Sequence, residues 1–77
     1  MDTLNGVLLS LPVLRKGAVE STIYTDQEVL WRICAKGEMA EKLLGLPEGT
    51  HVQLKGEFIL DSQGFHFNVQ KLWDAVS

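Results

Sequence analysis

The sequence has little with which to build a disulfide framework or a metal centre. Cys34 is the single cysteine among 77 residues, so no intramolecular disulfide can form, and a reducing compartment is the simpler expectation. The two histidines, His51 and His66, are separated by sequence typical of strands and cannot complete a zinc set with one cysteine. We therefore expect one domain over residues 1–77, stabilised by an apolar core and without a cofactor.

Long hydrophobic runs are also missing. The most apolar stretch, VLLSLPVL at residues 7–14, is interrupted by Ser10 and Pro12. It is too short for the core of a signal peptide or for a membrane span. We expect a soluble, cytoplasmic protein with no membrane partner.

Groupings of residues that support catalysis are not found either. No paired carboxylates and no His–acid pair stand at a meaningful spacing, and Cys34 has no partner at the spacing of a nucleophilic triad. Gly45, Gly49 and Gly56 occupy turn and bend positions rather than a phosphate-binding loop. The protein is therefore predicted not to be an enzyme.

Positive charge and aromatic rings are scarce. Seven Lys and Arg residues stand against ten Asp and Glu residues, which gives a net charge of −3, and 8% of the residues are aromatic. A nucleic-acid-binding protein usually carries a basic surface. Such a function would therefore require the few cations of this chain to cluster on one face.

The pattern that is present is the alternation of apolar and polar residues. Val19, Ser21 and Ile23 share one face of a predicted strand, and a second run is expected to turn Val29, Trp31, Ile33 and Ala35 towards the core. Strands are expected at residues 4–12, 18–26, 29–37, 51–60 and 65–73, with a loop at 13–17 and a helix of about two turns at 38–44.

The order strand–strand–strand–helix–strand–strand predicts an all-β protein with one short helix, a five-stranded Greek-key barrel of the OB-fold type. The helix is expected to close the open end of this barrel with Met39, Leu43 and Leu44. A β-grasp fold and an SH3-like barrel are the alternatives. The first has a longer helix after its first hairpin, and the second lacks a real helix, so both fit the pattern less well.

Two segments resemble bacterial single-stranded DNA-binding proteins. GVLLSLPVLR at residues 6–15 is similar to the first strand and loop of that family, and WRICAKGEMAEKLLGLPEGTHVQLKGEFI at 31–59 is similar to its third strand, helix and fourth strand. The resemblance implies an OB-fold that binds single-stranded DNA, with RNA as the alternative ligand. It also implies a homo-oligomer and contact with replication or repair proteins.

This chain departs from the family in three places. The second strand with its hairpin and the loop between the fourth and fifth strands are shorter, and Leu30 stands where an aromatic residue often precedes the third-strand arginine. The acidic C-terminal tail through which the family recruits partner proteins is not expected, because the sequence ends at Ser77 directly after Val76. A truncated member of the family, or a primosomal-protein-like relative without a tail, fits this pattern better than a full replicative binder.

Single-strand binding without sequence readout uses cations that follow phosphates and rings on which bases stack. In OB-folds these groups lie on strands two and three and on the flanking loops. The candidate binding residues are Arg15, Lys16, Tyr24, Arg32, Lys36, Lys55, Phe65 and His66. For several of them a structural role is equally open: Tyr24 as a cross-strand packing partner, and Arg15, Lys16 and Lys55 as solvated surface charge.

Two functions follow from this pattern. The first is a non-catalytic module that binds single-stranded DNA weakly per protomer and in a salt-dependent manner. The alternative is an OB-fold for protein interaction or assembly, favoured by the acidic residues Glu20, Glu28, Glu38 and Glu57 and by the exposed strand edges of a small barrel.

Overall fold

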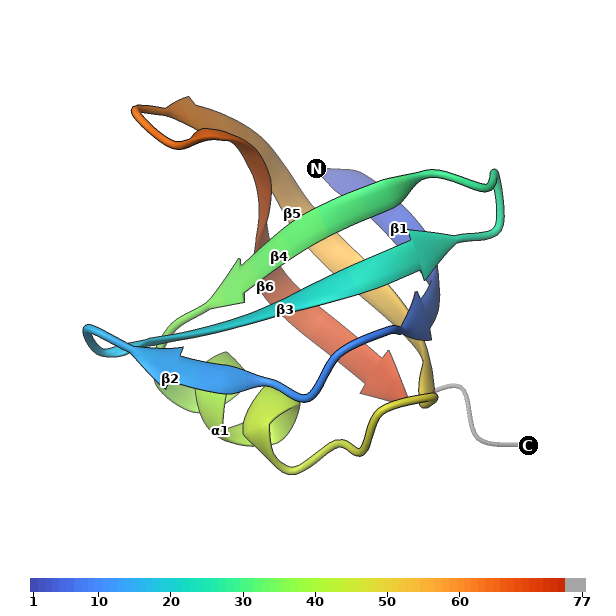
Figure 1. The fold of residues 1–77 in the computed structure, drawn as a ribbon, viewed down its shortest axis with the longest axis horizontal. Coiled ribbons are helices and arrows are strands. Elements are labelled where there is room, and N and C mark those ends of the chain that lie inside the picture. Colours follow the sequence, from blue (N-terminus) through green and yellow to red (C-terminus); the bar gives the residue numbers. More distant parts are fainter. Residues whose placement is uncertain (75–77) are drawn as a thin grey trace.

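Six strands and one helix make up the computed structural model, which describes residues 1–74 (Figure 1). The elements are β1 (Asp2–Leu8), β2 (Val13–Arg15), β3 (Ala18–Thr25), β4 (Leu30–Ala35), α1 (Gly37–Leu44), β5 (His51–Asp61) and β6 (Gly64–Asp74). The chain end, on which the expectation about the acidic tail rests, lies outside the described residues.

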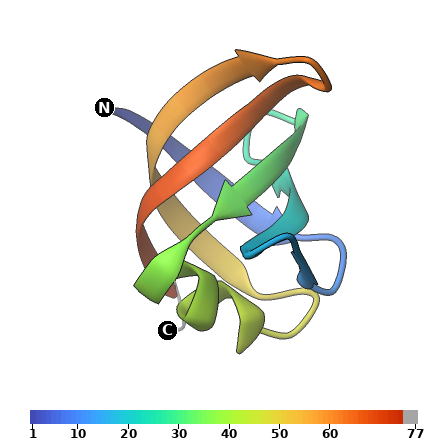
Figure 2. The ribbon, with the colours of Figure 1, turned by 90° about the vertical axis from the view of Figure 1, so that its left-hand side faces the viewer.

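Five of the strands close into a barrel. The pairing order is β1-β5-β6-β4-β3, and β1 pairs with β3 as well as with β5, so the sheet returns to its first strand. The pairing of β4 with β6 is parallel, and the others in the barrel are antiparallel. Figure 2 shows how the strands curve around the interior of the barrel. The predicted OB-fold barrel is confirmed.

The chain between β1 and β3 differs from its prediction. The first strand ends at Leu8 rather than Pro12, and residues 13–15, expected as loop, form β2 and pair with β3. Pro12 has no N–H for a ladder, which separates the two strands. Lys16 and Gly17 both have positive φ, 52° and 80°, as the two central residues of a tight hairpin do. A Lys-Gly pair is a weak signal for that turn.

The core lies on the inner faces of the barrel strands. Val19, Ser21 and Ile23 are buried as the alternation predicted, and so are Ile33 and Ala35. Val29 is 43% exposed, so its expected place in the core is wrong: it precedes β4 and lies past the covered part of the sheet. The other main contributors are Leu4, Leu8, Leu43, Val52, Leu54, Phe67, Val69 and Leu72.

Two glycines allow backbones to cross closely. A Cβ at Gly6 would overlap the carbonyl oxygen of Tyr24, where β1 pairs with both β5 and β3. A Cβ at Gly56 would overlap the carbonyl oxygen of Asn68, next to the register shift between β5 and β6. The predicted bend at Gly56 is therefore a β-bulge that tolerates no side chain.

Helix α1 packs against β3, β4 and β6 at one end of the barrel. Ala40 and Leu43 are buried, and Met39 packs partly against the core. Leu44 is 49% exposed, so its expected inward position is wrong. In an eight-residue helix the inner face passes through Ala40 and Leu43, and Leu46 after the helix packs against the core instead. Within residues 1–74 no helix is long and apolar enough to cross a bilayer.

The far ends of β5 and β6 project from the barrel at the end opposite α1 (Figures 1 and 2). We call this hairpin, residues 57–68, the arm. Cross-strand pairs in the arm join Phe58 to Phe67 and Leu60 to Phe65. Phe67 is fully buried in the barrel, whereas Leu60 and Phe65 are 66% and 58% exposed. The apolar face of the ribbon therefore continues beyond the core that covers it.

Candidate nucleic-acid interface

The outer surface of β3 and β4 is built by the residues that alternate with the core. Glu20 pairs with Cys34, Thr22 with Arg32, and Tyr24 with Leu30, so these side chains share one face. Ser21, Ile23 and Ile33 between them point inward and are buried. The burial of one side of the two strands thus decides which polar groups face outward.

The arm folds towards this face and leaves a cleft of about 400 Å³. Its walls come from three separate parts of the chain: β3, β4 with the following residue, and the arm. The residues that line it are Glu20, Arg32, Cys34, Lys36, Ile59, Asp61, Gln63, His66 and Asn68.

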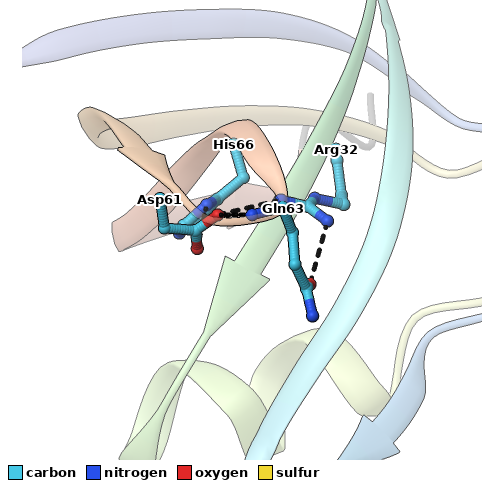
Figure 3. A network of polar contacts seen from close by, with 4 residues as sticks. All are labelled: Arg32, Asp61, Gln63 and His66. Atoms are coloured by element: carbon cyan, nitrogen blue, oxygen red, sulfur yellow. Dashed lines mark hydrogen bonds and ion pairs between the residues drawn. The ribbon is translucent and has the colours of Figure 1, made fainter.

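A polar network joins β4 to the arm across the cleft (Figure 3). Arg32 Nη1 donates a hydrogen bond to Gln63 Oε1 at 3.3 Å, and Arg32 Nη2 lies 3.8 Å from Asp61 Oδ1. The backbone N–H of Gln63 donates to Asp61 Oδ1 at 2.8 Å. Buried Nδ1 of His66 lies 3.4 Å from Asp61 Oδ2, without a hydrogen bond to any group in residues 1–74. Asp61 therefore lies near Arg32 with one carboxylate oxygen and near His66 with the other.

The charges that line the cleft are balanced. The cations Arg32 and Lys36 stand against the carboxylates Glu20 and Asp61, and Cys34 lies among them. Burial raises the pKa of the Cys34 thiol above its ordinary value, and Glu20 raises it further, against the opposing effect of Lys36. The thiol is therefore neutral near pH 7, which does not suit a nucleophile.

A second, shallower cleft of about 220 Å³ lies beside the first, between β2 and β3. Its lining includes Arg15 of β2 together with Leu11 and Val13. Glu20 and Arg32 line both clefts, so the two meet over this pair of residues. We call the two clefts together the outer groove.

Four of the eight predicted site residues line the outer groove, namely Arg15, Arg32, Lys36 and His66. Tyr24 lies on the same face of β3, is 40% exposed and is paired with Leu30. Lys16 is exposed at the tip of the β2–β3 hairpin and is not among the lining residues.

Lys55 and Phe65 lie away from the groove. Lys55 is in the barrel part of β5, opposite Thr3 of β1 and Lys71 of β6, with its Nζ 5.5 Å from the centre of the Trp73 ring. Phe65 faces Leu60 on the side of the arm opposite to His66. Because side chains alternate along a strand, Phe65 and His66 lie on opposite faces of the arm, although both were listed as candidate site residues.

Trp31, predicted in the core, is partly buried against it. Its ring lies 4.6 Å from that of Phe58, and Phe58 lies 5.0 Å from Phe67 in an edge-on arrangement. This aromatic cluster supports the base of the arm. The arm is thus attached by rings on its inner side and by the Arg32–Asp61 contacts on the side of the groove.

Among the groove residues that sequence reasoning missed are Glu20, Asp61 and Gln63. Glu20 is in phase with Thr22 and Tyr24, which was a usable signal for the outer face. Asp61 and Gln63 belong to the predicted hairpin turn, and no sequence pattern indicates that this turn folds back over β4. Among the residues described, no three His, Cys, Asp or Glu side chains are grouped so that they could hold a metal ion.

The barrel is similar to solved structures of single-stranded DNA-binding proteins. The SSB domain of a Synechococcus sp. protein matches with a TM-score of 0.81 and 16% identity over 92% of this chain and 90% of that one. The single-stranded DNA-binding protein of Thermus aquaticus matches with a TM-score of 0.87 and 20% identity over 97% of this chain and 39% of its own. The small single-stranded DNA-binding protein of Streptomyces coelicolor matches with a TM-score of 0.78 and 11% identity, over 97% of this chain and 91% of that one.

These likenesses confirm the resemblance drawn from residues 31–59 at the level of the fold. No protein-family model matches this chain, and no curated protein matches it in sequence. At identities of 20% or less the shared feature is the barrel with its helix.

Proposed function

We propose that the protein is a non-catalytic module that binds single-stranded DNA along the outer groove. The observation that carries this proposal is the position of the groove. It runs over β3 and β4 between the β2 hairpin and the arm, which is the surface on which OB-folds bind oligonucleotides. The likeness to structures of single-stranded DNA-binding proteins supports the same ligand.

The charges of the groove support weak binding by one protomer. Arg15, Arg32 and Lys36 are available for phosphates, while Glu20 and Asp61 oppose them. For about three phosphate contacts the logarithm of the binding constant falls with a slope of about −2 against the logarithm of salt concentration. Binding of one protomer is therefore weak near physiological salt.

Self-association would compensate for this weakness through avidity. The first residues of β1, Asp2–Leu4, pair with β5, whereas the pairing of β1 with β3 begins at Gly6. A partly open strand edge of this kind can pair with a second copy. We propose that the protein acts as a homo-oligomer in DNA replication or repair, and sedimentation analysis at several protein concentrations tests the oligomer.

Fluorescence anisotropy with labelled oligo-dT at low salt tests the binding. Arg32→Ala is expected to weaken binding about tenfold, the loss expected for one charge-assisted contact of ~1.4 kcal/mol. Lys42→Ala is the matched control, because Lys42 is an exposed cation on α1, outside the groove. No binding at micromolar protein in about 50 mM salt, where phosphate contacts are strongest, would refute the proposal. RNA of the same length measures the preference between the two nucleic acids.

A second function has support from the arm. Leu60 and Phe65 are 66% and 58% exposed on one apolar face, which suits a protein partner. If the unmodified protein bound no oligonucleotide at low salt but captured a protein partner, and Leu60→Ser abolished that capture, the protein-interaction function would replace the first one.

A further inference from the structure

Glu20 and Arg32 are opposite charges that lie close together without forming an ion pair. In the register of β3 and β4, Thr22 is opposite Arg32 and Glu20 is opposite Cys34, so Glu20 and Arg32 are diagonal neighbours on the outer face. Diagonal neighbours lie about 7 Å apart, within reach of long side chains. The guanidinium of Arg32 nevertheless contacts Asp61 and Gln63 of the arm.

This arrangement leaves the carboxylate of Glu20 available. Glu20 is partly buried and lines both clefts, and its side chain has no hydrogen bond or ion pair with the residues of the described chain. Asp61, by contrast, is paired with Arg32 and accepts a hydrogen bond from the backbone N–H of Gln63. A partly buried carboxylate without partners favours a ligand that brings N–H donors.

The outer groove thus presents a donor beside a double acceptor. Arg32 can donate an N–H bond, and the two oxygens of Glu20 can accept two parallel ones. The Watson–Crick edge of guanine carries the complement in the same order: the O6 acceptor, the N1–H donor and the N2 amine donor. Thymine has a single N–H between two carbonyls, and cytosine has one donor beside two acceptors.

The charge and size of the cleft also suit a base. Arg32, Lys36, Glu20 and Asp61 leave the lining of the larger cleft with no net charge, so a neutral ring can enter it without a net electrostatic penalty. Its volume of about 400 Å³ lies in the ~300–1,000 Å³ range of small-molecule sites. Bases of single strands are commonly recognised on their Watson–Crick edges.

We propose that Glu20 and Arg32 form a reading site for guanine, so that the groove binds a single strand more tightly where guanine occupies this position. The inference rests on the proposed function and adds a base preference to it. Arg32 donates to O6, and Glu20 accepts from N1–H and the N2 amine. The contacts to Asp61 and Gln63 hold Arg32 in place while the base enters.

Anisotropy titrations with the unmodified protein test the preference. The probes are dT oligonucleotides of about nine nucleotides, within the ~4–16 nucleotide range of an OB-fold, whose central residue is dT, dG, dA or deoxyinosine. The dG oligonucleotide is expected to bind about fivefold to tenfold more tightly than the dT oligonucleotide. Inosine, which lacks the N2 amine, is expected to lie between them.

The outcomes distinguish failure of the base preference from failure of single-strand binding. Equal affinities for all four oligonucleotides would overturn the reading site and leave single-strand binding intact. No binding of any oligonucleotide would refute the proposed function itself. If GMP displaced the labelled strand as effectively as the dG oligonucleotide does, the site would bind a free guanine nucleotide rather than guanine within a strand, and the inference would be overturned.

Glu20→Gln provides the test on the protein side, with Glu48→Gln as the matched control. Glu48 is an exposed glutamate in the turn before β5, so its substitution removes the same charge outside the groove. Glu20→Gln is expected to reduce the ratio of dG to dT affinity to about one, and Glu48→Gln to leave it unchanged. A Glu20→Gln protein that binds both strands more tightly at an unchanged ratio would show a role in charge alone and overturn the inference.

Discussion

The β5–β6 ribbon has two halves with the same alternation and opposite environments. In the barrel half, Val52, Leu54 and Val69 are at most 4% exposed. In the arm, Leu60 and Phe65 continue the same apolar face and are 66% and 58% exposed. Alternation identifies the face on which a side chain lies. Whether that face is covered depends on how far the neighbouring strands extend.

Within the arm, Phe67 at the covered base and Phe65 near the uncovered tip should show the largest difference in stability. Phe67→Ala is expected to reduce the free energy of unfolding by about 3–5 kcal/mol, because Phe67 is fully buried and a cavity would remain. Phe65→Ala, the same change two residues earlier, is expected to cost less than about 0.5 kcal/mol. Urea denaturation measures both. Similar losses for the two variants would mean that the arm is covered in solution.

Gly56 marks the boundary of the two halves and offers the next test. Gly56→Ala is expected to cost about 1–3 kcal/mol, because its Cβ would overlap the carbonyl oxygen of Asn68 at the bulge. Gly45→Ala is the control: its backbone is helical, with φ −81°, and the nearest atom to the added Cβ is 3.6 Å away. That change is expected to stabilise the protein by about 0.4–1 kcal/mol. A neutral Gly56→Ala in thermal unfolding would contradict the close crossing.

The polar side of the arm should affect binding more than stability. Asp61→Asn removes the carboxylate beside Arg32, whose side chain is 33% exposed, so the ion pair contributes at most ~1 kcal/mol to folding. Binding of oligo-dT is expected to strengthen about threefold, or ~0.6 kcal/mol, because a charge that opposes phosphates is lost. Asp74→Asn, at the end of β6 in the barrel half, should leave binding unchanged. Weaker binding by Asp61→Asn would contradict this expectation and show that Asp61 supports binding, for example by positioning Arg32.

Cys34 lies between barrel and arm and gives the smallest predicted effect. Burial and Glu20 raise the pKa of its thiol, so the native state holds this proton more tightly than the unfolded chain does. This contribution to stability is complete below the ordinary pKa range of a thiol and is lost as the pH rises through the raised native value. The pH profile of urea unfolding should therefore fall slightly above about pH 8.5. The same fall in Cys34→Ser would assign it to another group.

The barrel was predictable because its signals are local and repeated. Few folds are compatible with a single short helix and with the alternation through Val19, Ser21 and Ile23. The hairpin around Lys16 and the exposure of Leu44 escaped prediction for a different reason. A two-residue turn without Asn-Gly gives a weak signal, and a two-turn helix has too few residues to mark its inner face sharply.

The groove was predictable on one side only. Arg32 and Lys36 were predicted from the outward phase of the third expected strand, and Arg15 from its place in the expected loop at 13–17. All three line the groove. Asp61 and Gln63 line the groove because the arm lies close to β4. The hydrogen bond between Arg32 and Gln63 joins residues that are 31 positions apart in the sequence. No periodic pattern encodes a contact at that separation.

Local patterns were enough to predict a small barrel with a helix before its last two strands, since alternation and turn residues act over a few positions. They also identified the outward face of β3 and β4, although Val29 and Leu44 were wrongly placed in the core. Local patterns did not place Glu20 and Asp61 among the cations of one groove, or Leu60 and Phe65 beyond the core. Both outcomes depend on where the arm lies relative to β4, which is set by packing between distant segments.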